Sequence, residues 1–280
     1  MDRRAVLTGA IASAVLGTPA IARCREPFRL ALTPVFLDND AIVLDALKTA
    51  FDEGMGCDVE LVQRRTYEEI TNAILGGTVD AAWVCGYPFL QHRRELALQG
   101  VPVWRGRPLY QSYLIAGKKD PAQGLEDLRG GIHAFSDPNS NSGYLVTVSD
   151  LARMGEHPET FFARTIVTWG HRNVVRAVAG GLARSGSVDG YVWQVLARVE
   201  PELAARTRVV TRSEWLGFPP FAARADRHEE PAVFAFRRAL LTLHERASGR
   251  RALARLFLDR VDAAEPSLYA GIARRMADLG

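Results

Sequence analysis

Cysteine is scarce in this chain of 280 residues, which contains only Cys24, Cys57 and Cys85. An odd number of cysteines without metal-ligand spacing excludes a disulfide-rich scaffold and a zinc-finger type of site. The six histidines form no HExxH motif and no cluster with cysteine, so we expect neither a metal ion nor a cofactor. For Cys57 and Cys85 two states are open: a disulfide between them in an oxidising compartment, or two buried free thiols.

Motifs of common hydrolases and nucleotide-binding enzymes are also missing. Neither a GxSxG elbow nor a GxxxxGK[ST] loop occurs. Ser142, His171 and Asp189 follow one another in an order that a hydrolytic triad can adopt, but any chain of this length offers such a trio. An exported serine esterase is therefore only an alternative, and we do not expect an enzyme.

The chain has no block of basic residues. It carries 35 Lys and Arg against 32 Asp and Glu, a formal net charge of +3. A balance so close to neutral, without a basic stripe, argues against nucleic acid as a partner. Long apolar runs are equally rare, since the longest, at residues 5–16, is too short to span a bilayer.

This apolar run is part of an expected export signal. It follows Met1-Asp2-Arg3-Arg4 and precedes the small-residue site Ala20-Ile21-Ala22, which is the order of a secretory signal peptide over residues 1–22. The paired arginines directly before the run favour the twin-arginine route, and the general secretory route is the alternative. We therefore expect a soluble mature protein in the periplasm.

The rest of the chain alternates between short apolar runs and stretches with helical spacing, such as residues 41–53. This alternation predicts an α/β fold with mainly parallel sheets that helices cover on both faces. We expect two lobes, the first formed by residues 26–116 together with 219–280 and the second by residues 117–218. The chain would return to the first lobe through a proline-containing segment at residues 214–220.

The loop Ser136-Asp137-Pro138-Asn139-Ser140-Asn141-Ser142-Gly143 is the most informative segment, because it follows a predicted strand and precedes a helical pattern. The first N–H groups of a helix lack intrahelical partners and the helix dipole is positive there, so the loop can hold an oxyanion. Ser140, Asn141 and Ser142 add side-chain donors, and Gly143 lets a ligand approach the backbone. The alternative is that Ser140 or Ser142 only caps the helix.

Further loops are expected at the carboxyl ends of strands, where α/β sheets bind their ligands. Thr33 follows the first predicted strand, Tyr87 the third, and His171 a strand of the second lobe. His171 also directly precedes a helix, so it could pair with a dianion when protonated or donate a hydrogen bond when neutral. A capping or surface histidine is the alternative for His171, and a core position is the alternative for Tyr87.

The serine-containing loop also carries a resemblance to a known family. Asp137-Pro138-Asn139-Ser140-Asn141-Ser142-Gly143 resembles the Asp-Pro-x-Ser-x-Ser-Gly segment of periplasmic solute-binding proteins for phosphonate, phosphite and phosphate, which serve ABC importers. Gly170-His171, followed by a helix and Gly-x-Val-Asp, resembles the next ligand loop of that family. Residues 213–220 resemble its hinge segment.

The resemblance implies a type II periplasmic-binding-protein fold with a ligand cleft between two lobes. It implies a monomer that captures a small oxyanion and delivers it to the membrane permease of an ABC importer. The implied ligand-binding residues are Ser140, Asn141, Ser142, Gly143 and His171, with Thr33 and Tyr87 on the first lobe and Asp189 and Glu214 near the acids with which some members hold an amine.

The identity of the ligand is left open by two departures from the family pattern. Asn141 stands where members that bind aminophosphonate often carry threonine, and Cys85-Gly86-Tyr87-Pro88 is not the commonest first-lobe loop. Two alternatives to an importer subunit for phosphorus oxyanions therefore remain: a periplasmic sensor subunit for a membrane kinase, or a binder of a sulfonate-type or other small organic ligand.

Overall fold

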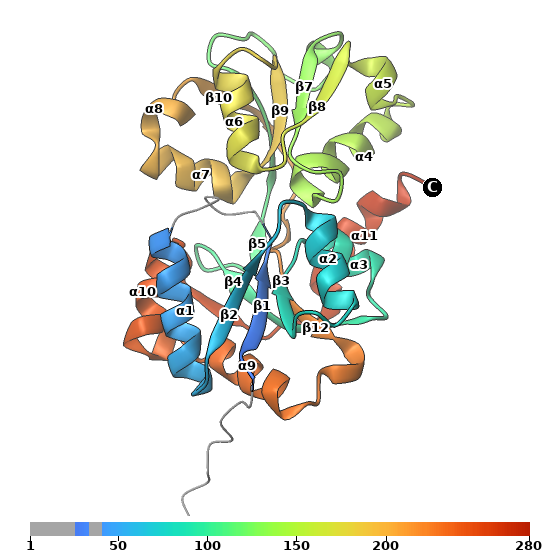
Figure 1. Cartoon of the computed structure of the whole chain (residues 1–280). Helices are drawn as coiled ribbons and strands as arrows, with labels where there is room; N and C mark the ends of the chain where they lie inside the picture. Colours follow the sequence, from blue (N-terminus) through green and yellow to red (C-terminus); the bar gives the residue numbers. More distant parts are fainter. Residues whose placement is uncertain (1–25, 34–40) are drawn as a thin grey trace, which may run out of the picture.

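The computed structural model describes residues 26–33 and 41–280, so the expected signal peptide at residues 1–22 lies outside the described part. The molecule has two α/β lobes, one above the other in Figure 1, joined by extended segments. Within the described ranges, no helix combines the length and apolar character that crossing a membrane requires.

Lobe 1 is built on a six-stranded sheet in the order β13-β4-β12-β3-β1-β2. Its strands are β1 (Phe28–Leu32), β2 (Val59–Gln63), β3 (Ala81–Trp83), β4 (Leu96–Val103), β12 (Phe221–Arg224) and β13 (Arg260–Asp262). Its helices are α1 (Ala41–Met55), α2 (Tyr67–Leu75), α3 (Gly86–Gln91), α9 (Pro231–Leu241), α10 (Ala247–Arg255) and α11 (Ala270–Ala277), with short 3-10 turns at Ala225–Arg227, Leu243–Glu245 and Pro266–Tyr269.

Lobe 2 is built on a five-stranded sheet in the order β10-β6-β9-β7-β8. Its strands are β6 (Ser112–Gly117), β7 (Ile132–Phe135), β8 (Arg164–Val167), β9 (Ser185–Asp189) and β10 (Thr207–Arg212). Its helical segments are the 3-10 turn η1 (Glu126–Leu128), the π-helical turn η2 (Asn141–Leu145), α4 (Val146–Arg153), α5 (Pro158–Phe161), α6 (His171–Ala179), α7 (Gly190–Val199) and α8 (Pro201–Ala204).

The local sequence explains why α2 begins at Tyr67, a residue that faces the candidate site described below. The Thr66 side chain accepts a hydrogen bond from the backbone N–H of Glu69, and the Glu69 carboxylate accepts one from the backbone of Thr66. This capping box satisfies two N–H groups and fixes the first residue of the helix, Tyr67. Tyr67, Ile70 and Ile74 then recur at helical spacing and are buried.

The two-lobed α/β architecture is confirmed, but each sheet is mixed rather than mainly parallel. In lobe 1, β1 runs parallel to β2 and β3, whereas β12 is antiparallel to β3 and β4. In lobe 2, β7 runs parallel to β8 and β9, whereas β6 is antiparallel to β9. β6 and β12, which enter each lobe from the other one, run antiparallel to the neighbouring strands, and β13 is antiparallel to β4 as well.

The first crossing between the lobes lies earlier than expected. β5 (Leu109–Tyr110) and β11 (Leu216–Gly217) pair antiparallel in a small separate sheet between the lobes, which we call the hinge sheet. Residues 112–116, expected as the last strand of lobe 1, belong to β6 and lie between β10 and β9 in lobe 2. The apolar runs before and after the crossing have the same character, so the sequence alone did not separate them.

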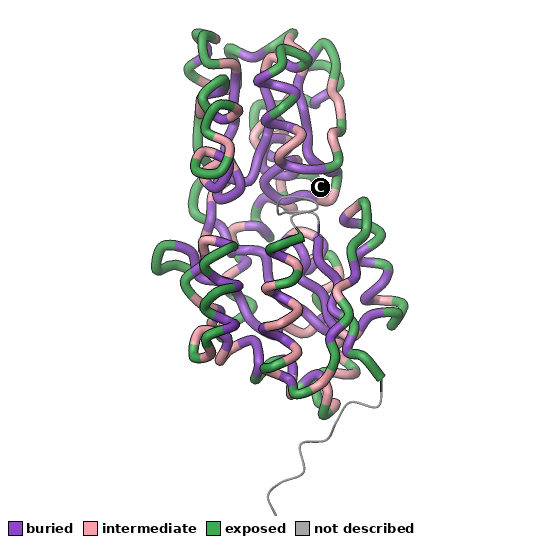
Figure 2. The backbone as a smooth tube through the Cα atoms, turned by 60° about the vertical axis from the view of Figure 1, so that its left-hand side comes forward, coloured by how far each residue is buried: buried purple, intermediate pink, exposed green. Residues whose placement is uncertain are grey.

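One large cluster of buried hydrophobic residues continues through both lobes, and a second, smaller cluster lies in lobe 2. Figure 2 shows buried backbone through the strands of both lobes and exposed backbone on outer turns and loops. Cys57 takes part in a disulfide, whereas Cys85 is a free and buried thiol. The two cysteines therefore do not pair with each other and are not both free, so both expectations for them were wrong.

Candidate ligand-binding site between the lobes

The serine-containing loop lies in the interior, between the end of β7 and the start of α4. Ser140, Asn141 and Ser142 are each at most 1% exposed. Ser140 caps the turn η2, because its hydroxyl oxygen accepts a hydrogen bond from the backbone N–H of Gly143 at 3.0 Å. The capping interpretation is thus correct for Ser140. The first turn is π-helical, a form that is frequent at functional sites.

Gly143 is required here by close packing rather than by a positive φ. Its carbonyl accepts a hydrogen bond from the backbone N–H of Ser136 at 3.1 Å. A Cβ atom at this position would lie 1.8 Å from Oγ and 2.7 Å from Cβ of Ser136. The glycine therefore lets the end of β7 and the serine-containing loop approach each other.

Two buried polar atoms of this region lack partners among the described residues: Oγ of Ser136 and Oδ1 of Asn141. Both residues are completely buried. Buried polar groups are nearly always hydrogen-bonded, so each exception calls for an explanation. The Ser136 hydroxyl would be able to donate to an anionic ligand between the lobes, whereas the Asn141 amide oxygen is an acceptor and needs a donor group.

His171 is the first residue of α6 and is buried. Its Nδ1 accepts a hydrogen bond from the backbone N–H of Asp189 at 3.1 Å, so Nδ1 carries no proton. The proton of the neutral ring is then on Nε2, which lies 3.2 Å from the hydroxyl of Tyr67. Burial lowers the pKa of His171 to about 3. Of the two forms that the sequence left open, the neutral one is therefore favoured over the protonated one.

Tyr67 is a further candidate for the site that was not predicted from the sequence. It lies in lobe 1, is 2% exposed, and contacts lobe 2 twice: through its hydroxyl to His171 and through its backbone N–H to Oδ2 of Asp137 at 3.1 Å. Because Nε2 of His171 donates to the Tyr67 oxygen, the phenolic hydrogen is left to donate elsewhere. Tyr67 follows the carboxyl end of β2, and the rule that selected Thr33 and Tyr87 would have found it.

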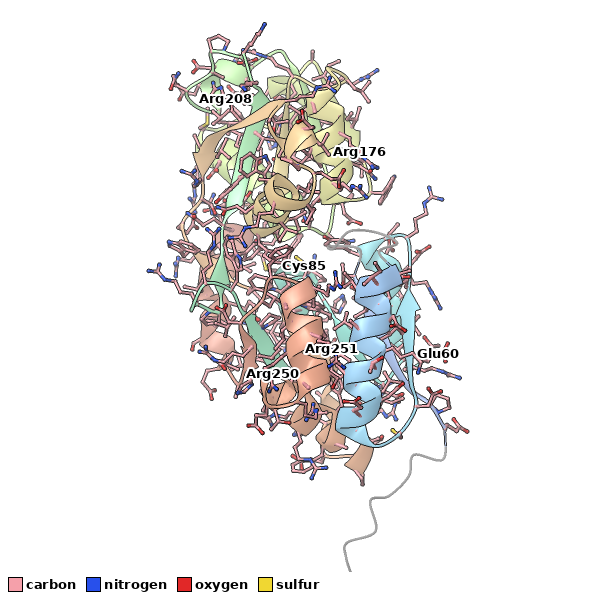
Figure 3. All side chains as sticks on the ribbon, turned by 90° about the vertical axis from the view of Figure 1, so that its left-hand side faces the viewer. Glu60, Cys85, Arg176, Arg208, Arg250 and Arg251 are labelled. Carbon is pink, nitrogen blue, oxygen red and sulfur yellow. The ribbon has the colours of Figure 1, made fainter. Side chains whose placement is uncertain are left out.

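Cys85 and Tyr110 complete the cluster and were likewise not predicted as site residues. The backbone N–H of Asn141 donates to Sγ of Cys85 at 3.3 Å, and the Asn141 side-chain amide donates to the hydroxyl of Tyr110 at 2.8 Å. The Ser142 side chain lies near the Tyr110 hydroxyl, since it acts against the burial that raises the pKa of Tyr110. Cys85 belongs to lobe 1 and lies between the lobes in Figure 3, while Tyr110 belongs to the hinge sheet. Both lobes and the hinge thus meet at one buried polar cluster.

Asp189 is buried beside this cluster, at the end of β9. Its carboxylate caps α7 by accepting hydrogen bonds from the backbone N–H groups of Tyr191 and Val192, at 2.8 and 3.2 Å. Burial nevertheless raises the pKa of Asp189 to about 7. Its charge acts on Tyr67 and Cys85, because it contributes to the raised pKa values of both groups. The structure thus brings Asp189, a residue that the family resemblance implied, next to His171.

The raised pKa of Asp189 predicts a pH-dependent stability. Its carboxyl has an ordinary pKa of 3.8 when solvated, so the folded protein holds the proton more tightly than the unfolded chain. Stability from this group therefore grows as the pH falls through 7. The Asp189 carboxyl alone adds about 1 kcal/mol to the free energy of unfolding when the pH falls from 8 to 6.5. The buried, neutral His133 and His171 act in the opposite direction over the same interval, because their ordinary pKa of 6.5 lies at its lower end. The effect of Asp189 is therefore expected in the difference between the wild-type protein and a variant without this carboxyl.

The matched variant for this prediction is Asp189→Asn, which keeps a side-chain oxygen to cap α7 but does not titrate. Urea denaturation of both proteins at pH 6.5 and pH 8 should show that the change in the free energy of unfolding differs between them by about 1 kcal/mol, with the wild-type protein favoured at the lower pH. The same change in both proteins would show that Asp189 does not titrate in this interval.

The remaining predicted ligand-binding residues, Thr33, Tyr87 and Glu214, make their contacts outside this polar cluster. The Thr33 hydroxyl donates to the carbonyl of Trp83 at 2.5 Å and so ties the ends of β1 and β3 together. Tyr87 is half-buried on α3, and its pKa is raised by burial and by the nearby Tyr144 of lobe 2. Glu214 forms a bidentate ion pair with Arg275, at 3.0 and 2.6 Å, rather than joining the cluster.

The distribution of charged side chains favours an anion that is bound by N–H and O–H donors and not by a buried cationic side chain. Among the described residues, Arg275 is the one Lys or Arg side chain that is buried, and it is already paired with Glu214 and Asp150. Gly170, the N-cap of α6, supplies no side-chain cap, so the first N–H groups of α6 stay available. The start of α6 and the serine-containing loop thus offer N–H and O–H donors on the lobe 2 side.

Comparisons with known proteins agree with this geometry. The family model described as "ABC transporter, phosphonate, periplasmic substrate-binding protein" matches residues 33–269. A curated relative, "Phosphate-import protein PhnD" of Mycolicibacterium smegmatis, is 26% identical over 212 residues. This match spans 71% of the chain and 66% of the relative, which is just under two thirds of the relative's length.

Solved structures show the same fold. A binding protein component of an ABC phosphonate transporter from Pseudomonas aeruginosa has a TM-score of 0.82 at 22% identity, covering 89% of this chain and 85% of that one. PhnD1 from Prochlorococcus marinus, in complex with methylphosphonate, has a TM-score of 0.78 at 17% identity, covering 90% and 97%. At these identities the two structures establish the two-lobed fold and nothing finer.

Proposed function

The chain belongs to the family of periplasmic substrate-binding proteins of phosphonate ABC transporters, and on this basis we propose that it captures a small phosphorus oxyanion between its lobes. The captured ion, a phosphonate, phosphite or phosphate, would be delivered by the monomeric protein to the membrane permease of an importer. The curated relative is a phosphate-import protein and one structural relative holds methylphosphonate, which supports this range of ligands.

The observation that carries the proposal is the buried polar cluster between the lobes. It draws on the serine-containing loop and His171 from lobe 2, Tyr67 and Cys85 from lobe 1, and Tyr110 from the hinge sheet. Hydrogen bonds between residues of different lobes can form only when the lobes are closed, so capture would be coupled to closure. The unpartnered oxygens of Ser136 and Asn141 lie in the same cluster.

Binding without turnover fits the orientation of the candidate triad residues. In a hydrolytic triad the aspartate carboxylate accepts a hydrogen bond from Nδ1–H of the histidine. Here Nδ1 of His171 is itself an acceptor, and the Asp189 carboxylate caps α7 instead. We therefore propose a binding role for Ser142 and no catalytic role.

The family is periplasmic, which agrees with the export signal expected at residues 1–22. We propose that the twin-arginine route carries the protein across the inner membrane, because Arg3 and Arg4 directly precede the apolar run. Replacing both arginines with lysine and following the location of the protein would test this route.

The Ser142→Ala variant tests the proposed site. Loss of one donor to a buried charged ligand costs about 1.5–3 kcal/mol, which corresponds to a roughly 10- to 150-fold loss of affinity. We expect calorimetric titration with methylphosphonate to show a loss of this size. Ser267→Ala, at an exposed position of lobe 1, is the matched control and should bind like the wild-type protein. Affinity unchanged within twofold in Ser142→Ala would remove this loop from the site.

A further inference from the structure

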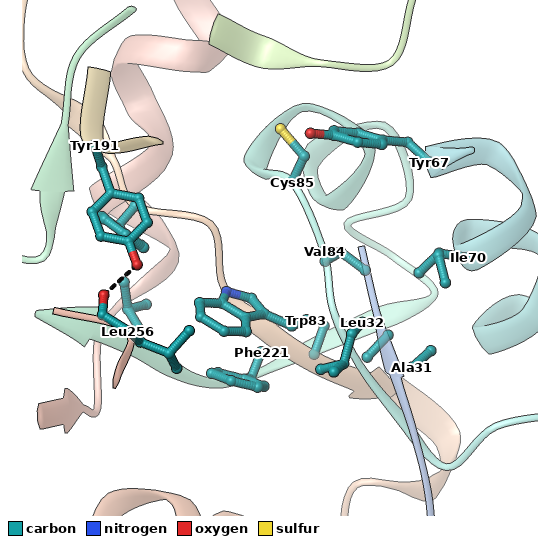
Figure 4. Packing of buried hydrophobic residues seen from close by; sticks show 14 of the residues in the cluster. Ala31, Leu32, Tyr67, Ile70, Trp83, Val84, Cys85, Tyr191, Phe221 and Leu256 are labelled. Carbon is teal, nitrogen blue, oxygen red and sulfur yellow. Dashed lines mark hydrogen bonds between the residues drawn. The ribbon is translucent and has the colours of Figure 1, made fainter. Parts of the chain in front are cut away.

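A groove on the surface of lobe 1 is separate from the site between the lobes. It has a volume of about 600 Å³, and its walls come from α3, β4, α9, the 3-10 turn at Pro266–Tyr269 and the start of α11. The residue before α3 is Cys85, which lies beside Tyr67 in Figure 4, whereas the groove begins one turn further along this helix, at Phe89. No residue of the polar cluster lines this cavity, which we call the lobe 1 groove.

The walls of the lobe 1 groove are largely apolar and are fixed by the fold. Phe89, Leu96 and Tyr269 are buried behind it, and Leu90 is half-buried. The ring centroids of Phe89 and Tyr269 are 5.2 Å apart, and the Tyr269 hydroxyl donates a hydrogen bond to the carbonyl of Phe218 at 2.9 Å. A ligand would therefore meet a preformed apolar surface, as most small-molecule sites offer.

Two arginines without partners line the same groove. Arg93, which follows α3, and Arg237 on α9 are both exposed, and neither side chain forms an ion pair or a hydrogen bond within the described residues. Other arginines of lobe 1, such as Arg227 and Arg260, are each paired with a carboxylate. Glu265 also lines the groove, at the positive end of the helical turn that follows it, so the two arginines leave a net positive charge.

We propose that the lobe 1 groove is a second binding site, for an organic acid that joins a carboxylate to an apolar chain. The chain would remove apolar wall from water, and the carboxylate would pair with the planar guanidinium groups of Arg93 and Arg237. A small inorganic oxyanion lacks the apolar chain, and an amine of the same length has the wrong charge. The ligand class therefore differs from that of the site between the lobes.

Decanoate is the probe, titrated calorimetrically into the wild-type protein below its micellar concentration. We expect saturable binding of one decanoate per chain with a Kd of about 0.1–1 mM, the affinity of a ligand of this size. Acetate, which lacks the chain, and decylammonium, which reverses the charge, should each bind at least roughly tenfold more weakly. An excess of methylphosphonate should leave the Kd for decanoate unchanged within twofold, because the two sites share no residue.

Neighbouring arginines supply matched controls for the rim. We expect Arg93→Gln and Arg237→Gln each to weaken decanoate binding by roughly fivefold, the value of an ion pair near the surface. Arg94→Gln and Arg238→Gln change the same net charge at exposed positions that do not line the groove, and should bind within twofold of wild type. Glu265→Gln removes the opposing carboxylate and should strengthen binding.

Thermal unfolding of each variant establishes that it is folded. No saturable binding of decanoate by the folded wild-type protein, equally tight binding of decylammonium, or affinities within twofold of wild type in both Arg93→Gln and Arg237→Gln would overturn the proposal. So would displacement of decanoate by methylphosphonate, which would place it between the lobes. Each of these results leaves the proposed function intact, because capture of a phosphorus oxyanion is measured by its own titration.

Discussion

Replacing Gly143 with alanine is expected to lower the affinity for methylphosphonate by roughly 100-fold, because overpacking of this kind costs up to about 3 kcal/mol. The new Cβ would lie 1.8 Å from Oγ and 2.7 Å from Cβ of Ser136, and 3.0 Å from Cε1 of His171. Rotating the Ser136 side chain relieves only the first of these contacts, so the backbone of η2 must move. That movement displaces the N–H and O–H donors of the serine-containing loop, and calorimetric titration measures the loss.

Gly117→Ala is the matched control, because a Cβ atom at that position in β6 meets no atom within 4 Å. We expect this variant to bind and unfold like the wild-type protein. If Gly143→Ala were folded and bound methylphosphonate within threefold of wild type, the close approach of the loop to Ser136 would have no part in the site.

Replacing Arg275 with methionine is expected to lower the free energy of unfolding by about 2 kcal/mol. This loss is smaller than the cost of breaking a fully buried ion pair, because the partner carboxylates are partly exposed. Arg275 lies on α11, is 4% exposed, and binds Glu214 bidentately, the carboxylate of Asp150, and the carbonyl of Val146 at 3.3 Å. Through these contacts α11, whose chain comes from lobe 1, docks on α4 of lobe 2, beside which it lies in Figure 1.

The loss of stability should appear as a fall in Tm of roughly 4–8 °C for a chain of this size. Arg274→Met, at the exposed neighbouring position of the same helix, is the control and should change Tm little. Arg275→Lys should give an intermediate value, since an ammonium group keeps the charge but cannot pair bidentately. Equal Tm values for the Met variants of Arg274 and Arg275 would mean that this network does not stabilise the closed arrangement.

Much of the lobe 2 side of the site could be predicted from the sequence. The serine-containing loop and His171 were found because they stand between a predicted strand and a predicted helix, where backbone N–H groups converge. Asp189 came from the family resemblance. The structure places the loop, His171 and Asp189 together because β7 and β9 are neighbouring parallel strands.

The strand-end rule could have selected Tyr67 in lobe 1 as well, but the contacts that join lobe 1 and the hinge sheet to lobe 2 could not be predicted, because they depend on how the lobes meet. The contact between Tyr67 and His171 joins residues that are 104 positions apart. Cys85 was considered as a disulfide partner or a free thiol but not as a ligand-binding residue, and Tyr110 lies at the crossing whose position was misjudged. The charge state of His171 was left open as well, since burial decides it and spacing does not report burial.

The most direct test of the account is isothermal titration calorimetry on the mature wild-type chain, refolded to strip any ligand it carries. Phosphate, phosphite, methylphosphonate and aminoethylphosphonate would be titrated, with sulfate and taurine as controls. Micromolar or tighter binding of at least one phosphorus oxyanion is the predicted result. Tight binding of sulfate or taurine alone, or no heat of binding from any phosphorus oxyanion with folded protein, would contradict the claim that the cluster between the lobes captures such an ion.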